Sequence, residues 1–504
     1  MKIQKIFKEV DLINVNGSME REISSVYYDS RKVDNGSLFV AIKGLNSDGH
    51  DFLGEAIKRG AKAVVVENGY QQSVIRDRLS ETTCISVRDS RKALALISAN
   101  FYGHPSREMS VIGITGTNGK TTISYLINSI LKVNGFKTGL IGTIDYRFNG
   151  EIIPSSHTTP ESLDLQMFFK RVVNGGGKYC VMEVSSHSLE LDRVYGTSFE
   201  TVVFTNLTQD HLDFHGTLEK YFNVKARLFK EYGLKKAVIN IDDPYGRRLI
   251  SDTKSEKILT YGIKEDADVK ADNISLSIDG LKFIANTSIG KLKIESRLIG
   301  MHNVYNILAA ISAAILEGLT RKNIIEGVLS VDVVSGRMER INEMQDFTVI
   351  VDYAHTDDAL KNVLKAAREI PHNRITVVFG CGGDRDRGKR PLMGKVAIEY
   401  SDFVIITSDN PRSEEPLKII EEIEKGIKQW SVVSGQWSVD DRYIKIPDRR
   451  EAIEFAINNA SKGDIVIIAG KGHEDYQIFK DKKIHFDDRE VAREAIRKAT
   501  SNEQ

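Results

Sequence analysis

Short apolar runs alternate with stretches of helical periodicity along most of the chain. The runs at residues 110–117, 138–144, 179–188, 201–208 and 236–244 are rich in Val and Ile, and each ends in Gly or polar residues. Continuous apolar strands that alternate with helices are typical of a parallel sheet covered on both faces. The pattern therefore predicts an α/β fold, with helices at about 123–133, 221–229 and 307–316.

Two breaks divide this pattern into three parts. Residues 103–108 (GHPSRE) carry Gly and Pro but no hydrophobic period, which indicates a linker. After residues 335–340 the strand pattern resumes at 347–356, 374–384, 402–411 and 464–475. We predict a smaller α/β domain at 1–106, a central P-loop ATPase-like parallel sheet at 107–335 and a Rossmann-like α/β domain at 336–504. Open α/β sheets bind ligands where loops leave the carboxyl ends of the strands.

Composition narrows the class of protein. The 504 residues carry 70 Lys+Arg and 70 Asp+Glu, so the formal net charge is zero and a nucleic-acid partner is not expected. The three cysteines lie far apart in no metal-binding spacing, which fits a reducing compartment. The longest nearly apolar stretch, residues 307–316, is much shorter than the ~20 residues that span a bilayer. We expect a cytoplasmic protein without membrane insertion.

A phosphate-binding loop is predicted between the first central strand and its helix. Residues 116–122 (GTNGKTT) place two glycines before Lys120 and Thr121. Backbone N–H groups of such a loop and the helix N-terminus can hold a polyphosphate, with the Lys at the terminal phosphates and the Thr hydroxyl on Mg²⁺. The strict GxxxxGK[ST] pattern would need Gly at 114, where the chain has Ile. The alternative is a Gly-rich turn with a chance Lys-Thr pair.

Several other residues are candidates for metal or nucleotide contacts. Glu183, at a strand end, offers a carboxylate suited to Mg²⁺ or simply caps a loop. In the cluster Asp210, His211, Asp213 and His215, one ligand, His211, is expected rather than four. The local sequence around Lys225 alone favours a solvated or ion-paired lysine. Asn303 and Asn306 are three residues apart on one helix face and either read a nucleobase or cap the helix.

Taken together, the motifs resemble those of the Mur ligase family, the ATP-dependent ligases of peptidoglycan precursor synthesis. The resemblance covers roughly residues 25–478. It rests on residues 116–122 (GTNGKTT), 157–162 (HTTPES), 182–189 (MEVSSHSL), 205–216 (TNLTQDHLDFHG), 221–229 (YFNVKARLF), 300–310 (GMHNVYNILAA), 335–341 (SGRMERI), 351–360 (VDYAHTDDAL), 380–393 (GCGGDRDRGKRPLM), 408–412 (SDNPR) and 469–477 (AGKGHEDYQ).

The resemblance implies an ATP site with two Mg²⁺ ions. Thr121 and Glu183 would hold the first ion, with His211 near the second. Lys225 would be carbamylated by CO₂ and would then be an anionic ligand of the second ion. Lys120, Lys225 and His211 would be the catalytic residues. The ATP contacts would be Gly116, Thr117, Asn118, Gly119, Lys120, Thr121, Thr122, Asn303, Arg337, Asp352 and His355.

The resemblance also implies a nucleotide-sugar substrate, UDP-N-acetylmuramoyl-L-alanyl-D-glutamate. Its uracil end would lie on the N-terminal domain near Ser30 and Asn46, and its muramoyl-dipeptide end near Thr158, Thr159, Ser185 and Arg193. The chain departs from the family pattern at Leu45-Asn46-Ser47, where His-Gln-Ala is common, and at Leu191, where many relatives have Gln. The resemblance therefore does not define the substrate contacts at residues 45–47 and at Leu191.

The incoming amino acid is expected to meet Arg412. A guanidinium can hold a carboxylate through two parallel hydrogen bonds, and meso-diaminopimelate has a distal carboxylate that L-lysine lacks. The sequence DNPR is the form carried by family members specific for diaminopimelate. Matching residues for the other contacts are Arg385, Asp409, Asn410, Gly470 and Glu474. Lanthionine, which also has two carboxylates, is not distinguished from diaminopimelate.

The activity implied is ATP-dependent amide formation through an acyl phosphate, by a protein acting as a monomer on small-molecule substrates. Three alternatives remain open. One is an L-lysine-adding ligase of the same subfamily, and another is a different ligase of similar architecture, such as a folylpolyglutamate synthetase. The third is a non-catalytic nucleotide-binding relative.

Overall fold

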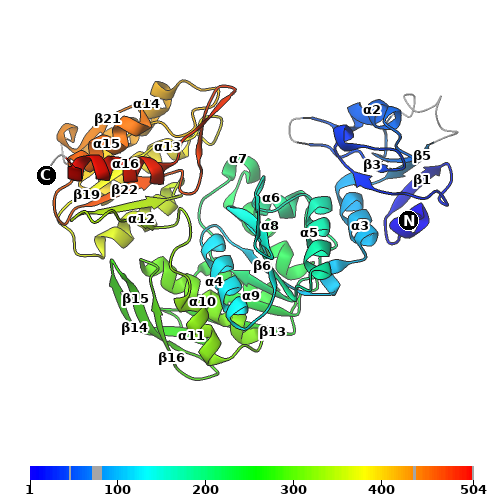
Figure 1. Ribbon diagram of the computed structural model, residues 1–504, viewed down its shortest axis with the longest axis horizontal. Helices are drawn as coiled ribbons and strands as arrows, with labels where there is room; N and C mark the ends of the chain where they lie inside the picture. Colours follow the sequence, from blue (N-terminus) through cyan, green and yellow to red (C-terminus); the bar gives the residue numbers. More distant parts are fainter. Residues whose placement is uncertain (45–46, 71–81, 435–438, 502–504) are drawn as a thin grey trace.

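The computed structural model describes residues 1–44, 47–70, 82–434 and 439–501. Three large sheets follow one another along the chain, and Figure 1 shows the second lying between the other two. The α/β fold predicted from the apolar runs is confirmed, because strands and helices alternate through all three parts. Among the described residues, no helix is both long and apolar enough to cross a membrane.

The N-terminal sheet has the strand order β1–β5–β4–β3–β2, and its neighbours are parallel except β1 with β5. Its strands are β1 Leu12–Asn16, β2 Val26–Tyr27, β3 Leu38–Val40, β4 Ala63–Glu67 and β5 Thr83–Val87, with helices α1 Ile3–Ile6, α2 Leu53–Lys58 and α3 Ser90–Tyr102 and 3₁₀ turns η1 Ser30–Lys32 and η2 Gly49–Phe52. Helix α3 begins where Asp89 accepts hydrogen bonds from the N–H groups of Arg91 and Lys92.

The central sheet has eleven strands in the order β16–β15–β14–β13–β12–β11–β6–β10–β7–β8–β9. They are β6 Ser110–Thr115, β7 Thr138–Ile141, β8 Asp145–Phe148, β9 Glu151–Pro154, β10 Tyr179–Glu183, β11 Thr201–Phe204, β12 Lys236–Asn240, β13 Lys257–Gly262, β14 Val269–Ser277, β15 Gly280–Asn286 and β16 Leu292–Ser296. The segment from β14 to β7 is parallel, and both edges are antiparallel. The antiparallel edges were not predicted.

Helices cover both faces of the central sheet. One apolar cluster joins it to α4 Lys120–Val133, α10 Met301–Leu316 and α11 Arg321–Leu329, and a second joins it to α5 Ser162–Asn174, α8 Leu218–Lys230 and α9 Pro244–Asp252. Three short elements complete this part: η5 Pro105–Arg107, α6 Ser186–Glu190 and α7 Leu212–His215. Helix α4 begins three residues before the predicted start, because the left-handed Gly119 (φ 89°) turns the chain directly into Lys120.

The C-terminal sheet has the order β17–β18–β22–β19–β20–β21, parallel except for β17. Its strands are β17 Glu339–Ile341, β18 Thr348–Asp352, β19 Ile375–Phe379, β20 Phe403–Ile406, β21 Tyr443–Lys445 and β22 Ile465–Ala469. One face packs on α12 Asp357–Arg368, α13 Lys389–Tyr400 and α14 Pro416–Ser434, and the other on α15 Arg449–Asn458 and α16 Asp488–Ser501. The turn η6 Asp440–Arg442 and the hairpin of β23 Tyr476–Phe479 and β24 Lys482–His485 lie outside the layers.

Candidate active site

The predicted phosphate loop lies between the carboxyl end of β6 and the first turn of α4. Gly116 (φ 147°) and Gly119 (φ 89°) both adopt backbone conformations that favour glycine. A Cβ at either position would collide with a polar side chain, Thr205 at the first and Asn306 at the second. The Lys120 ammonium donates to the carbonyl oxygens of Gly116 (3.0 Å) and Thr117 (2.8 Å). The loop is therefore compact, and its lysine lies over the loop's own backbone.

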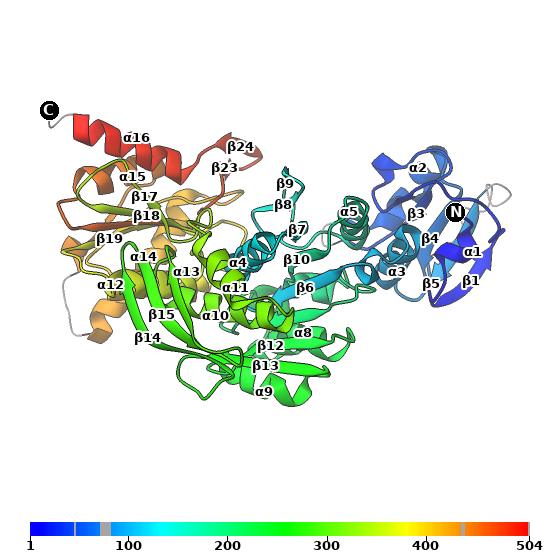
Figure 2. The same ribbon diagram turned by 60° about the horizontal axis from the view of Figure 1, so that its bottom comes forward.

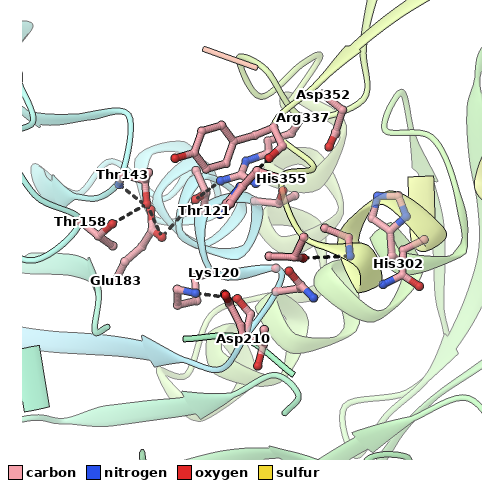
Figure 3. A pocket seen from close by; sticks show the side chains of 18 of the residues that line it. Lys120, Thr121, Thr143, Thr158, Glu183, Asp210, His302, Arg337, Asp352 and His355 are labelled. Carbon is pink, nitrogen blue, oxygen red and sulfur yellow. Dashed lines mark hydrogen bonds between the residues drawn. The ribbon is translucent and has the colours of Figure 1, made fainter. Parts of the chain in front are cut away.

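Glu183 is held at the end of β10 beside this loop. Thr121 donates its hydroxyl to Oε2 of Glu183 (3.1 Å), and Thr143 donates its N–H to Oε1 (2.8 Å) and its hydroxyl to Oε2 (3.0 Å). Figure 3 shows Glu183 between these two threonines. Oxygen donors of this kind suit Mg²⁺, which prefers carboxylate and hydroxyl ligands and keeps several waters. The two residues predicted for the first metal ion therefore lie together.

Lys225 on α8 is 1% exposed and donates to the Gly116 carbonyl oxygen (2.9 Å), the same oxygen that Lys120 contacts. Burial and then the Lys120 charge lower its pKa well below the ordinary value, with Asp210 opposing. A solvated Lys225, one of the two ordinary roles considered from the sequence, is therefore wrong. A neutral amine, rather than an ammonium, is the form that adds CO₂, so the surroundings fit the predicted carbamate.

His211 precedes α7 with a left-handed backbone (φ 54°), and its Nε2 lies 3.3 Å from Oδ2 of Asp210. Burial lowers the pKa of His211 to about 4, with His187, Lys225 and Lys120 adding to the effect and Asp210 opposing it. His211 is therefore neutral near pH 7 and can offer a ring nitrogen as a ligand. Within the described residues, no group of three or more His, Cys, Asp or Glu side chains forms a metal site by itself.

The C-terminal part closes a cavity of about 240 Å³ over the phosphate loop, here called the interdomain cavity. It is lined by Thr117, Asn118, Gly119, Lys120, Thr121, Thr122, Thr143, Thr158, Glu183, Ser185, Asp210, His211, His302, Asn306, Arg337, Asp352, Tyr353, His355, Thr356, Ala359, Asn362 and Val363. Arg337 reaches across to Thr121, donating to its Oγ1 at 3.2 Å. Burial raises the pKa of Asp352, opposed by Arg337, and lowers that of His355 to about 4.

Asn303 does not line this cavity. It is 3% exposed, donates to the carbonyl oxygen of Ile299 (2.8 Å) and accepts from the Nδ2 of Asn306 (2.8 Å). Asn306 lines the cavity instead, so Asn303 orients the amide that does so. Helix α10 is capped by Gly300 without a side-chain cap, which makes the helix-capping alternative wrong for both asparagines.

A second cavity of about 390 Å³, here called the Arg412 pocket, brings together all six residues predicted to contact the amino acid. Its lining residues are His187, Gln209, Asp210, His211, Tyr353, His355, Thr356, Asp357, Cys381, Gly382, Arg385, Asp386, Lys389, Asp409, Asn410, Arg412, Gly470, Glu474 and Tyr476. Burial and the Asp409 charge raise the pKa of Glu474. The pocket therefore contains cations and carboxylates side by side.

Arg412 is fixed by its backbone. It has a left-handed conformation (φ 52°), its N–H donates to the Ile478 carbonyl oxygen (3.0 Å), and its own carbonyl oxygen accepts from the N–H of Lys480 (2.6 Å). Its guanidinium donates to the Gly383 carbonyl oxygen at 2.7 Å. Strained non-glycine residues often occur at functional sites, and this one lines the Arg412 pocket.

A third cavity of about 780 Å³, here called the Arg193 cavity, contains Thr158, Thr159, Ser185 and Arg193 and reaches His187 and His211. Thr159 anchors this wall, donating to the Glu183 carbonyl oxygen (2.8 Å) and accepting from the N–H of Ser185 (3.1 Å). The Arg193 cavity shares Thr158 and Ser185 with the interdomain cavity, and Arg385 and Glu474 with the Arg412 pocket, so the three cavities adjoin.

Ser30 lies elsewhere, in a cavity of about 480 Å³ on the N-terminal sheet, here called the Ser30 cavity. It is lined by Tyr28, Asp29, Ser30, Arg31, Phe39, Ile42, Gly44, Ser47, Gly49, Phe52 and Glu55. Asn46, the other residue predicted for the uracil end, lies outside the described residues, as does Leu45.

Sequence reasoning missed several residues of these cavities. Thr143 follows β7 without any motif, yet it makes two hydrogen bonds to Glu183. His302 lines the interdomain cavity, and burial followed by the Arg337 charge lowers its pKa to about 4. Lys471 lies within the motif at 469–477 but had no predicted role, and it is fully buried. The only signal for it was a lysine between two glycines after an apolar strand.

Comparison with known proteins gives family matches in all three parts of the chain. Residues 22–102 match the description "Mur ligase family, catalytic domain", residues 114–314 "Mur ligase middle domain" and residues 336–472 "Mur ligase, glutamate ligase domain". A protein of Geobacter sulfurreducens named UDP-N-acetylmuramoyl-L-alanyl-D-glutamate–2,6-diaminopimelate ligase is 46% identical over 516 residues, covering 100% of both chains. The chain belongs to the Mur ligase family.

Further Mur ligases are similar to this chain in sequence or in fold. A protein of the same name from Clostridium tetani is 46% identical over 98% of this chain and 99% of its own length. A solved structure of a ligase of that name has a TM-score of 0.68 and 34% identity, and 99% of each chain is covered. MurF ligase from Thermotoga maritima in complex with ADP shares the fold, with a TM-score of 0.63 at 20% identity over 96% of this chain and 99% of that one.

Proposed function

We propose that the chain is an ATP-dependent ligase that joins meso-2,6-diaminopimelate to UDP-N-acetylmuramoyl-L-alanyl-D-glutamate. The observation that carries the proposal is the Arg412 pocket, which adjoins the phosphate loop's cavity and combines Arg412 and Arg385 with Asp409 and Glu474. A diaminopimelate molecule has two carboxylates and two ammonium groups, so it matches both signs of charge. The names of the full-length relatives support the same substrate pair.

The first step activates the substrate's carboxylate. The γ-carboxylate of D-glutamate attacks the γ-phosphorus of ATP, an oxygen–phosphorus bond forms, and ADP leaves, giving an acyl phosphate. Lys120 and the loop N–H groups stabilise the charge on the transferred phosphoryl group. Arg337, which contacts Thr121, brings a further cation from the C-terminal part. Thr158, Thr159, Ser185 and Arg193 orient the peptide end of the substrate in the Arg193 cavity.

Two Mg²⁺ ions fit the residues present. Thr121 and Glu183 would hold one, and His211 with a carbamylated Lys225 would hold the other; Asp210, 3.3 Å from His211, orients that imidazole. When bound, such ions withdraw negative charge from the phosphates. Burial lowers the pKa of Lys225 well below its ordinary value and that of His211 to about 4, so both side chains release their protons more readily to make room for a metal ion.

The second step forms the amide bond. The amine of diaminopimelate attacks the acyl carbon, phosphate leaves with the carbon–oxygen bond's electrons, and the nitrogen loses a proton to solvent. Arg412 and Arg385 hold substrate carboxylates, while Asp409 and Glu474 attract its ammonium group. Because one chain supplies the residues for both steps, we further propose that the protein acts as a monomer.

The alternatives place different groups in the Arg412 pocket. L-Lysine would bring its side-chain ammonium toward Arg412 and leave the guanidinium without a partner, which disfavours it. A non-catalytic relative would bind ATP but would not turn over. The intact set of Lys120, Glu183, His211 and Lys225 around one loop favours catalysis.

Release of phosphate tests the proposal. The protein is incubated with ATP, Mg²⁺ and the UDP-dipeptide, adding diaminopimelate, lanthionine or L-lysine in turn. We expect turnover with the two dicarboxylic amino acids. Turnover with L-lysine should be at least about 100-fold lower, because the Arg412 guanidinium would lose its carboxylate partner and face an ammonium group instead. Equal turnover with L-lysine would exclude the assignment of Arg412, and no turnover with any of the three would favour the non-catalytic alternative.

A variant separates Arg412 from general damage. Arg412→Met is expected to raise KM for diaminopimelate about 100-fold while leaving KM for ATP within about two-fold. The matched control is Arg387→Met, because Arg387 is exposed and pairs with Glu414 outside the pocket lining. A selectivity for diaminopimelate that survives Arg412→Met would contradict the role given to this residue.

A further inference from the structure

Lys471 is a buried cation behind the wall of the Arg412 pocket. Its side chain is 0% exposed, and its Nζ lies 3.4 Å from Oδ1 of Asp409, 3.2 Å from Oδ1 of Asn410 and 3.6 Å from Oε2 of Glu474. Those three residues line the pocket and Lys471 does not. The lysine therefore contacts the polar wall from behind, and the proposed reaction does not use it.

The backbone around Lys471 is built to direct it inward. Strand β22 ends at Ala469, and the lysine is flanked by Gly470 (φ 120°) and Gly472 (φ 56°). A Cβ at Gly472 would lie 2.7 Å from Cβ of Tyr353, so this position has no room for a side chain. Both glycines accept conformations that other residues rarely adopt. The turn therefore places the Lys471 ammonium in the protein interior, where the loss of hydration has to be offset by contacts with other polar groups.

The contacts of Lys471 set the charge of the wall. Burial acts to raise the pKa of Asp409, but Lys471, followed by Arg449 and Arg412, outweighs it and lowers that pKa. Burial and Asp409 raise the pKa of Glu474, and Lys471 opposes them. Two neighbouring buried carboxylates do not both ionise unless a cation lies close. Arg449 is already paired with Asp488 through two hydrogen bonds of 2.7 Å, which leaves Lys471 for this task.

Lys471 also orients an amide. The Oδ1 of Asn410 accepts from Lys471 (3.2 Å) and from the N–H of Ile478 (3.1 Å), and its Nδ2 donates to Glu474 (3.0 Å). Because the oxygen faces the cation, the amide has one orientation. Arg412 also acts on the charges of Asp409 and Glu474, so without the lysine it would be a main source of compensating positive charge for the two carboxylates.

We propose that Lys471 is a positioning residue for recognition of the incoming amino acid. It holds Asp409, Asn410 and Glu474 in the arrangement that receives the substrate's ammonium group, and it leaves Arg412 to the substrate's carboxylate. This inference rests on the proposed ligase function.

The test compares two nucleophiles in Lys471→Met and Lys471→Arg. Hydroxylamine is small, needs no amino-acid pocket and converts an acyl phosphate to a hydroxamate with release of phosphate. In Lys471→Met, KM for diaminopimelate should rise about 10- to 100-fold while hydroxamate formation stays within about two-fold of wild type. Lys471→Arg should recover part of the loss, since it keeps the charge. Lys445→Met is the control, because Lys445, on strand β21 of the same sheet, pairs with Glu424 on α14, outside the pocket.

The pH profile separates positioning from loss of structure. Glu474 faces Asp409, Asn410, Lys471, Arg412, Arg449, Tyr353 and Tyr476. When Glu474 is protonated it no longer attracts an ammonium group, so kcat/KM for diaminopimelate falls as the pH falls through its pKa. Removing the Lys471 charge raises that pKa further, so the acid limb should move to higher pH in Lys471→Met. The acid limb for hydroxylamine should not move.

The outcomes are distinguishable. If wild-type protein forms neither hydroxamate nor amide, the proposed function fails. If wild type is active and Lys471→Met keeps its KM for diaminopimelate, or loses both reactions together, the role of Lys471 is overturned. An acid limb for diaminopimelate that stays in place in Lys471→Met would overturn that role as well.

Discussion

Two lysines donate hydrogen bonds to the same backbone carbonyl oxygen in the phosphate loop. Lys120 and Lys225 both donate to the oxygen of Gly116, at 3.0 Å and 2.9 Å. Burial disfavours the charged form of Lys225, and repulsion from the Lys120 ammonium adds to this effect, so the pKa of Lys225 lies well below the usual range. The structure therefore supplies a reason, independent of any motif, for Lys225 to lose its proton more readily than an ordinary lysine, and the neutral amine is the form that reacts with CO₂.

The carbamate proposed on Lys225 predicts that small carboxylates restore activity to a variant without this lysine. Lys225→Ala should lose at least about 100-fold in kcat, because an anionic metal ligand is removed, and should regain part of it with formate or acetate, which can supply a carboxylate. Native mass spectrometry should show one bound CO₂ equivalent in wild type that the variant lacks. Lys220→Ala, exposed on the same helix, is the control and should behave as wild type. Full activity of Lys225→Ala without rescue would disprove the carbamate.

At the scale of elements, the strand–loop–helix unit of β6 and α4 fixes the phosphate loop. Helix α4 has a positive-φ glycine at each end, Gly119 (φ 89°) before it and Gly135 (φ 80°) after it. A Cβ at Gly119 would collide with Asn306, whereas a Cβ at Gly135 would meet nothing within 4 Å. Both ends of α4 therefore need a glycine for its positive φ, but only Gly119 is closely packed against another side chain.

This difference predicts unequal effects of one substitution. Gly119→Ala and Gly135→Ala should each lose about 1 kcal/mol of unfolding free energy from backbone strain. Only Gly119→Ala should also weaken ATP binding, by about 10-fold or more, because Asn306 and the loop must move. Calorimetric titration with ATP and urea unfolding measure the two quantities. Equal ATP affinity in both variants would contradict the close packing of the loop against α10.

The strands and motifs with strong local signals were predictable. The continuous apolar runs became β6, β7, β10, β11 and β12, and the glycines before Lys120 located the loop. The β9 strand was not predicted, because three of its four residues are exposed and no hydrophobic pattern marks it. Thr143 contacts Glu183 across 40 residues, and such a pairing depends on the strand order. Asn303 and Asn306 shared one face, but the sequence could not tell which amide faces the cavity.

At the scale of the whole molecule, the C-terminal part contacts the phosphate loop directly. Asp358 at the start of α12 accepts from Nδ2 of Asn118 (2.8 Å) and from the hydroxyl of Thr208 (2.9 Å). The N-terminal part contacts α5 instead, where the Tyr28 hydroxyl donates to Asp164 (2.6 Å). The proposed domain boundaries after residues 106 and 335 lie between the sheets that these bonds connect.

The Asp358 contacts predict a link between the two parts. Asp358→Ala should raise KM for ATP about 10-fold, because two hydrogen bonds to a carboxylate that orient the loop are lost, while KM for the UDP-dipeptide changes little. Asp279→Ala is the matched control: Asp279 pairs with Arg340 across the same two parts (3.1 Å) but is 83% exposed. Steady-state kinetics check both. An equal effect of the two variants would show that the contact with the loop is not the cause.

The Ser30 cavity is lined entirely by the N-terminal part, and Figure 2 shows that part at the opposite end of the molecule from the C-terminal sheet. A substrate that extends from the Ser30 cavity to the phosphate loop would be bound in that cavity by a part of the substrate that does not react. Binding energy from a remote, unreactive portion can be used to orient the reacting atoms, so shortened substrates lose turnover as well as affinity. The uridine end of the proposed substrate would then supply binding energy without reacting, and it would not need to change when the peptide end of the same molecule is lengthened.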